Sequence, residues 1–164
     1  MENLQPRRET ELEHRVIEIL QEMVSRMPSG TASLRVSGVP GQPSLPEPYF
    51  ELVPSNSAAG RISGVVEHDE IELTVGRGGT RSLFAAGGTI FEGLSCEDEF
   101  REICKTVVQE GFTEQVVRDR HGKFIYAEAI VVVRGKTVKF DSGRWLPLPF
   151  SRRKRESVVY GPYY

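Results

Sequence analysis

The sequence predicts an α+β fold, in which two main helices pack on a mostly antiparallel sheet. Two segments, 10–27 and 96–110, carry apolar residues at helical spacing. The remaining apolar segments suggest strands and are joined by turns too short for crossover helices, which favours antiparallel pairing. The predicted order is helix, several strands, helix and three-strand meander. Helices segregated from the strands of an antiparallel sheet are typical of the α+β class.

The first helix is predicted to begin at Thr10, because Thr10 and Glu13 match the capping-box pattern. Its apolar residues fall on one stripe: Leu12, Val16, Ile19, Leu20, Met23, Val24 and Met27. Pro28 and Gly30 end the helix. We expect the stripe to face the core and the opposite, charged face to be solvated.

Strand candidates fill the stretch between the helices. The pattern predicts strands at 32–36 and 49–53, a hairpin formed by 62–66 and 71–75, and short strands at 82–85 and 89–91. In 71–75, apolar and polar residues alternate, so one face of this strand is expected to be buried and the other to be acidic and wet. Residues 38–48 hold four of the ten prolines, and we interpret them as a loop within one domain.

The second helix is predicted from about Cys96 to Glu110, with Ser95 and Asp98 as a capping box and Gly111 as the residue after its end. Three strands follow, at about 113–119, 124–133 and 136–141. The middle strand of this meander is the most apolar stretch of the chain and is expected to lie centrally in the sheet.

The length of 164 residues suits one domain. We expect a frayed lead-in at 1–9, a single α+β domain at 10–150 and a basic, aromatic C-terminal tail at 151–164. No apolar run approaches the ~18–20 residues that span a bilayer, and the polar N-terminal stretch does not match a Sec signal. The composition therefore predicts a soluble, cytoplasmic protein without membrane contact.

The two cysteines, Cys96 and Cys104, are expected to be free thiols, because eight residues of helix separate them by about 12 Å. With only three histidines and no CxxC pair, no zinc-site spacing is present, and we expect neither a metal nor a cofactor. Cys96 is the candidate reactive thiol, because a helix N-terminus lowers a thiol pKa. Three acidic neighbours at 97–99 oppose this and favour an ordinary helix residue.

The sequence contains no catalytic constellation, and we expect no catalytic residue. The glycine-rich stretch 76–81 lacks the P-loop pattern, but its backbone and two arginines could hold an anion. We favour the commoner interpretation, a mobile hairpin loop with solvated arginines. Glu128 interrupts an apolar strand and shares a face with Tyr126, so it either pairs with an arginine such as Arg118 or Arg144 or faces solvent. The candidate ligand-binding residues are Arg77, Arg81, Tyr126, Glu128, Arg144 and Trp145.

Charge is unevenly distributed along the chain. The net charge of −2 combines an acidic excess in residues 1–95 with a basic excess in residues 96–164. Complementary charge steers association between proteins, so we take the acidic hairpin and the basic tail as candidate partner-binding surfaces. Their residues are Glu67, Asp69, Glu70, Glu72, Arg152, Arg153, Lys154 and Arg155.

These features favour a non-catalytic binding or regulatory module that acts through protein–protein association, in the manner of small α+β immunity proteins of bacteria. This likeness is one of class only. The first alternative is a small-ligand-binding protein or enzyme, with a site near the second helix and the central strand. Weak nucleic-acid binding through the tail, where aromatic residues interleave with arginines, ranks third because the first half of the chain is acidic. Self-association through the aromatic residues of 157–164 is a further alternative.

Overall fold

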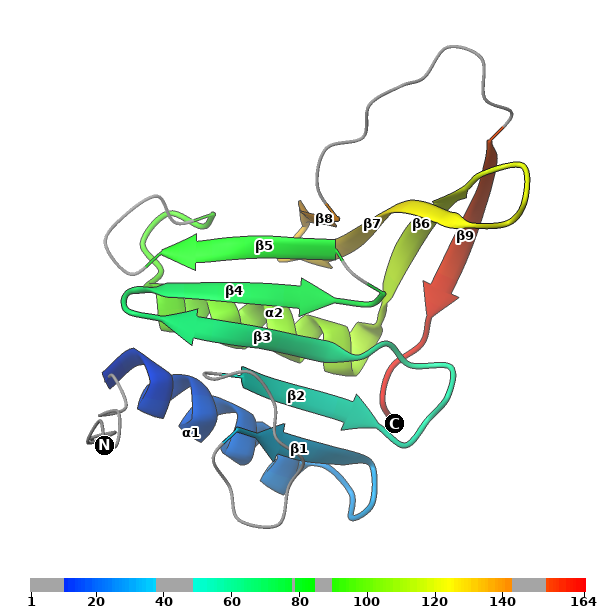
Figure 1. The fold of residues 1–164 in the computed structure, drawn as a ribbon. Helices are drawn as coiled ribbons and strands as arrows, with labels where there is room; N and C mark the ends of the chain where they lie inside the picture. The colour runs from blue at the N-terminus through cyan, green and yellow to red at the C-terminus, as the bar shows by residue number, and fades with distance from the viewer. Residues whose placement is uncertain (1–10, 38–48, 78, 85–89, 143–152) are drawn as a thin grey trace, which may run out of the picture.

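The computed structural model describes residues 11–37, 49–77, 79–84, 90–142 and 153–164. In this part of the chain two helices and one nine-stranded antiparallel sheet confirm the predicted α+β fold (Figure 1). The helices are α1 (Glu11–Arg26) and α2 (Cys96–Glu110). The strands are β1 (Ala32–Val36), β2 (Tyr49–Pro54), β3 (Ile62–Glu67), β4 (Glu70–Val75), β5 (Gly79–Phe84), β6 (Phe112–Arg118), β7 (Phe124–Val133), β8 (Lys136–Asp141) and β9 (Lys154–Tyr160).

The sheet has the strand order β1-β2-β3-β4-β5-β8-β7-β6-β9, and all neighbouring pairs are antiparallel. The predicted hairpin is β3–β4, and the predicted meander is β6–β7–β8. The predicted strand at 82–85 begins earlier, at Gly79. The predicted strand at 89–91 is wrong for residues 90 and 91, which form bends before α2; residue 89 lies outside the described residues, as does Thr10.

Both helices contribute apolar stripes to the single hydrophobic core. Leu12, Val16 and Leu20 of α1 and Phe100, Ile103 and Val107 of α2 are buried together with the inward residues of the strands. The rings of Phe50 on β2 and Phe100 on α2 meet edge to face with centroids 5.7 Å apart. The helices also contact each other, so they form one layer on the sheet. No described helix has the length and apolarity that crossing a membrane requires.

The start of α2 follows the predicted capping box. Ser95 has an extended backbone, and its hydroxyl oxygen accepts a hydrogen bond from the Asp98 backbone N–H at 3.1 Å. The Ser95 hydroxyl also lies 2.9 Å from the Asp98 carboxylate. At the other end, Gly111 adopts φ 76°, and its N–H donates to the Val107 carbonyl at 3.1 Å. These contacts fix where α2 ends and β6 begins.

The sheet bends sharply between β5 and β8, which are paired only at Thr80 and Asp141. Beyond this bend, β6 and β9 run steeply across the direction of β3, β4 and β5 (Figure 1). The bend turns the β6–β9 end of the sheet toward the loop that joins β2 to β3. Two distant parts of the sheet therefore approach each other at one end of the molecule.

The C-terminal segment connects these two parts of the sheet. Gly161 forms a bridge with Ala59 in the β2–β3 loop, and the Asn56 side-chain amide donates to the Pro162 carbonyl at 3.1 Å. Tyr163 is only 3% exposed, and its hydroxyl donates to the Gly60 carbonyl at 2.9 Å. We call this junction, formed by residues 56–60 and 160–163, the seam. The aromatic C-terminal residues thus pack against the chain's own sheet.

Candidate functional site

The predicted ligand-binding residues do not gather in one site. Tyr126 and Glu128 do share a face of β7, as expected, with the Tyr126 hydroxyl 3.5 Å from the Glu128 carboxylate. Glu128 is half-buried and pairs with Lys139 at 3.3 Å rather than with Arg118, whose partner is Glu156. Arg144, the other partner considered, and Trp145 lie outside the described residues.

The Tyr126–Glu128 strip does not form an acid–base pair poised for chemistry. Burial raises the pKa of the Tyr126 phenol, and the carboxylates of Glu128 and Asp141 raise it further. The phenol therefore stays protonated at neutral pH and acts as a hydrogen-bond donor. The two predicted arginines also separate: Arg81 reaches the Lys139 carbonyl on β8 at 3.3 Å, whereas Arg77 lies at the turn near Glu114 of β6.

Cys96 is free and buried, and so is Cys104. Burial raises the pKa of the Cys96 thiol to about 12, and the carboxylates of Glu97 and Glu99 act in the same direction. The structure therefore favours the interpretation of Cys96 as an ordinary helix residue.

We predict that iodoacetamide leaves Cys96 unmodified in the folded protein at pH 8. With a thiol pKa of about 12, on the order of one Cys96 in ten thousand would be a thiolate at that pH. Peptide mapping by mass spectrometry should find modification of both cysteines only after unfolding in urea. Fast alkylation of Cys96 under native conditions would contradict this prediction.

The acidic partner-binding candidates lie on the sheet face that points away from the helices. Glu67, Glu70 and Glu72 alternate with the buried residues of β3 and β4, and Glu67 is directly opposite Glu70. Asp69 is exposed in the turn. Like charges in register destabilise a hairpin, and no described residue forms an ion pair with these four side chains. None of these four residues lines the cavities described below.

The basic candidates belong to the sheet edge rather than to a separate extension. Lys154 and Arg155 are exposed on β9, and Lys154 pairs with Glu156 at 3.1 Å. Arg118 of β6 also pairs with Glu156, at 3.4 Å. Because one carboxylate serves two cations, the basic run is partly neutralised. Arg153 is half-buried, and Arg152 lies outside the described residues.

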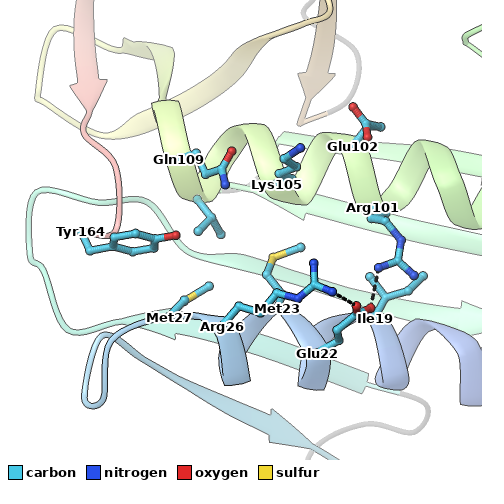
Figure 2. A pocket seen from close by; sticks show the side chains of 11 residues that line it. Ile19, Glu22, Met23, Arg26, Met27, Arg101, Glu102, Lys105, Gln109 and Tyr164 are labelled. Atoms are coloured by element: carbon cyan, nitrogen blue, oxygen red, sulfur yellow. Dashed lines mark hydrogen bonds and ion pairs between the residues drawn. The ribbon is translucent and has the colours of Figure 1, made fainter.

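A groove between α1 and α2, absent from the sequence-based candidates, combines apolar and charged residues. It lies on the side of the helical layer that faces away from the sheet and contains a cavity of about 180 Å³. Figure 2 shows side chains of α1 and α2 facing one another across it, with Tyr164 at one end. Its lining residues are Ile19, Glu22, Met23, Arg26, Met27, Arg101, Glu102, Lys105, Val108, Gln109 and Tyr164.

The α1–α2 groove has an apolar floor. Ile19, Met27 and Val108 are buried, and Met23 is half-buried and reaches the cavity (Figure 2). Methionine side chains are unbranched and polarizable, and proteins use them at surfaces that adapt to more than one partner. A cavity of about 150 Å³ with apolar walls can hold a benzene ring, so this one has room for one large apolar side chain.

The charged wall of the groove is held in place by one shared carboxylate. Glu22 lies 2.6 Å from Arg101 on α2 and also pairs with Arg26 on its own helix (Figure 2). The hydrogen bond from Arg101 and the charge of Arg26 hold the Glu22 pKa below its usual value. Glu102 pairs with Arg134 at 3.1 Å. Among the described residues, Lys105 forms no ion pair, so it is the lining charge without compensation.

A second cavity, of about 420 Å³, continues the groove toward the N-terminal ends of both helices. Its lining shares Ile19, Glu22 and Arg101 with the first cavity. The other residues that line it are Arg15, Glu18, Ser95, Glu97 and Asp98. Carboxylates outnumber cations at this end, whereas cations outnumber carboxylates at the Met23 end. The groove is therefore polarised along its length.

The apolar stripe of α1 holds one sequence signal for this groove. The whole stripe is predicted to face the core, yet Met23 is only half-buried against it. An apolar side chain that the core does not fully cover leaves apolar surface for another contact. Which helix would lie beside it depends on tertiary structure, because Glu22 and Arg101 are far apart in the sequence.

Comparison with known proteins provides no further guidance. No protein-family model matches the chain, and neither a curated protein nor a solved structure matches it.

Proposed function

We propose that this protein is a non-catalytic binding module whose α1–α2 groove takes an amphipathic segment of a protein partner. The observation that carries the proposal is the apolar cavity beside Met23, outside the packed core and rimmed by Arg26, Arg101 and Lys105. Helix-in-groove recognition uses the same elements, an apolar anchor in a groove and polar contacts around it. One large apolar side chain of the partner would fill the cavity.

Charge defines the chemistry of the partner segment. Because Lys105 has no ion pair among the described residues and the other lining charges are paired, an acidic side chain next to the anchor would complement this end. The acid-rich end includes Glu18, which lies five residues of α1 before Met23. At 1.5 Å per residue this is roughly 7.5 Å. A basic side chain at that distance from the anchor would complement it.

A selection from displayed helical peptides tests the proposal. We expect the enriched peptides to share one large apolar residue flanked by aspartate or glutamate. Their affinity should fall at least tenfold for Met23→Glu, because the new carboxylate would place a charge in the apolar floor and would repel the acidic residues of the peptide. Lys105→Glu should weaken binding in the same direction. Gln21→Glu is the matched control, since it adds the same charge to an exposed position of α1 outside the groove.

Two outcomes would contradict the proposal. In one, the selection enriches no peptide, or the enriched peptides bind the Met23→Glu variant as tightly as the unaltered protein. In the other, sedimentation velocity shows a dimer that Met23→Glu converts to a monomer. In that case a second copy of the chain, rather than a different protein, would occupy the groove.

A further inference from the structure

We propose that a cleft at the seam is a second binding site, which takes a small molecule bearing a phosphate or carboxylate group. The cleft lies between the β2–β3 loop and the β4–β5 turn and has a volume of about 460 Å³. Ligand pockets usually measure about 300–1,000 Å³. The site is separate from the α1–α2 groove, with which it shares no lining residue.

The lining of the seam cleft favours an anion. Two arginines, Arg61 and Arg77, contribute to its wall, and no aspartate or glutamate does. Their side chains are 55% and 47% exposed, so their donors are accessible to a ligand. Each guanidinium has five N–H donors in a planar arrangement that matches the oxygens of a phosphate or carboxylate.

Arg61 is oriented by a buried carboxylate behind the cleft. The Glu51 side chain is 5% exposed and lies 2.6 Å from Arg61 and 3.5 Å from Arg35. Two arginines share this one carboxylate, so the group keeps a net positive charge. Glu51 holds Nη1 of the Arg61 guanidinium, and Arg61 also lines the cleft. Such positioning of a charged group lowers the cost of binding, because the side chain is ordered in advance.

The Arg77 side of the cleft is fixed by a fully buried carboxylate on β6. Glu114 accepts hydrogen bonds from the Arg77 backbone N–H at 2.8 Å and from the Tyr160 hydroxyl at 2.9 Å. The Arg77 guanidinium is farther from it, with Nε at 4.0 Å. The turn backbone is thus held by a hydrogen bond, whereas the guanidinium lies farther from Glu114 and also interacts with the Tyr160 hydroxyl. This arrangement leaves the Arg77 side chain available to pair with a ligand.

Two glycines, Gly60 and Gly76, directly precede the two arginines and line the cleft. A Cβ at Gly76 would lie 2.7 Å from the Glu114 carboxylate, and this residue has φ +76°. Gly60, on the opposite side, packs against the rings of Phe112 and Tyr160. Larger residues would displace the groups that position Arg77. The proposed anion site thus pairs Arg77 with Arg61 rather than with Arg81, and this pairing requires the closure of the sheet at the seam.

Titration with phenyl phosphate and with benzoate at constant ionic strength tests this inference, with phenol as the uncharged probe. We expect phenyl phosphate, benzoate or both to bind and phenol to show no comparable binding. In amide NMR spectra, the signals of Gly60, Gly76 and Arg77 should shift. Binding of only one of the two anions would identify phosphate or carboxylate as the recognised group.

Arginine variants assign any binding to the cleft. Arg77→Gln is expected to weaken anion binding at least tenfold. Arg77→Lys should keep only part of the affinity, because an ammonium lacks the planar donor pair. Arg61→Gln should weaken anion binding similarly. Circular dichroism checks the folding of this variant, because Glu51 loses a partner. Arg120→Gln, at an exposed turn between β6 and β7, is the matched control. The inference is overturned if neither anion binds, or if Arg77→Gln binds the anion unchanged.

Discussion

Replacing Gly111 with alanine is expected to lower the free energy of unfolding by about 3–5 kcal/mol or to prevent folding. Gly111 has φ 76° and ψ −162°, a conformation available almost only to glycine. A Cβ there would lie 2.9 Å from the carbonyl carbons of Tyr160 and Gly161 and closer still to the Tyr160 oxygen. These are backbone atoms, which cannot rotate away as a side chain can.

The surrounding hydrogen bonds prevent the two segments from separating at Gly111. The Gly161 N–H donates to the Ala58 carbonyl, and the Tyr163 N–H donates to the Val108 carbonyl, both at 2.9 Å. Urea unfolding followed by circular dichroism measures the loss. Gly122→Ala is the matched control: Gly122 has φ +80° but no atom near its Cβ position, so we expect a loss of about 1 kcal/mol. Equal losses for the two variants would contradict the seam geometry.

Tyr163→Ala is expected to destabilise the protein by about 3–5 kcal/mol, the range for removing a buried aromatic ring. The ring is 3% exposed and belongs to the hydrophobic core, so its removal opens a cavity where the C-terminal segment crosses the β2–β3 loop. Tyr163→Phe keeps the ring and leaves the Gly60 carbonyl without its 2.9 Å donor. This smaller change should cost about 1–3 kcal/mol.

Thermal and urea unfolding measure both Tyr163 variants. The neighbouring Tyr164 provides the control, because its side chain is 58% exposed. Tyr164→Ala should change the free energy of unfolding by no more than about 0.5 kcal/mol. If Tyr163→Ala were no more damaging than Tyr164→Ala, the C-terminal segment would not be packed as the structure has it.

The helices and most strands were predictable because their signals are local. The stripe of α1, the Ser95 cap and the alternation of β4 depend only on neighbouring residues. The sequence does not predict strand β9, because its apolar and polar residues do not alternate in the usual way. Glu156, Val158 and Tyr160 are its half-buried residues, whereas Val159 is 75% exposed. A charged residue on the more buried side and a valine on the open side conceal the period of two.

The candidate sites were less predictable, because each combines residues that are distant in the sequence. Arg77 was singled out as a candidate, but the residues that position it are Glu114 and, through Glu114, Tyr160. Glu51 and Glu114 resemble ordinary polar strand residues, and only the folded chain supplies the partners that let them be buried. For the α1–α2 groove, the pairing of Glu22 with Arg101 depends on how the two helices pack.

The α1–α2 groove is proposed to receive an apolar side chain of a partner. The NMR spectrum of isotope-labelled methionine methyl groups during titration with a peptide from the selection tests this. The chain has three methionines, and two of them, Met23 and Met27, line the groove. We predict that the methyl signals of Met23 and Met27 shift and saturate together with binding. A peptide that binds to saturation and leaves both signals unmoved would contradict the claim.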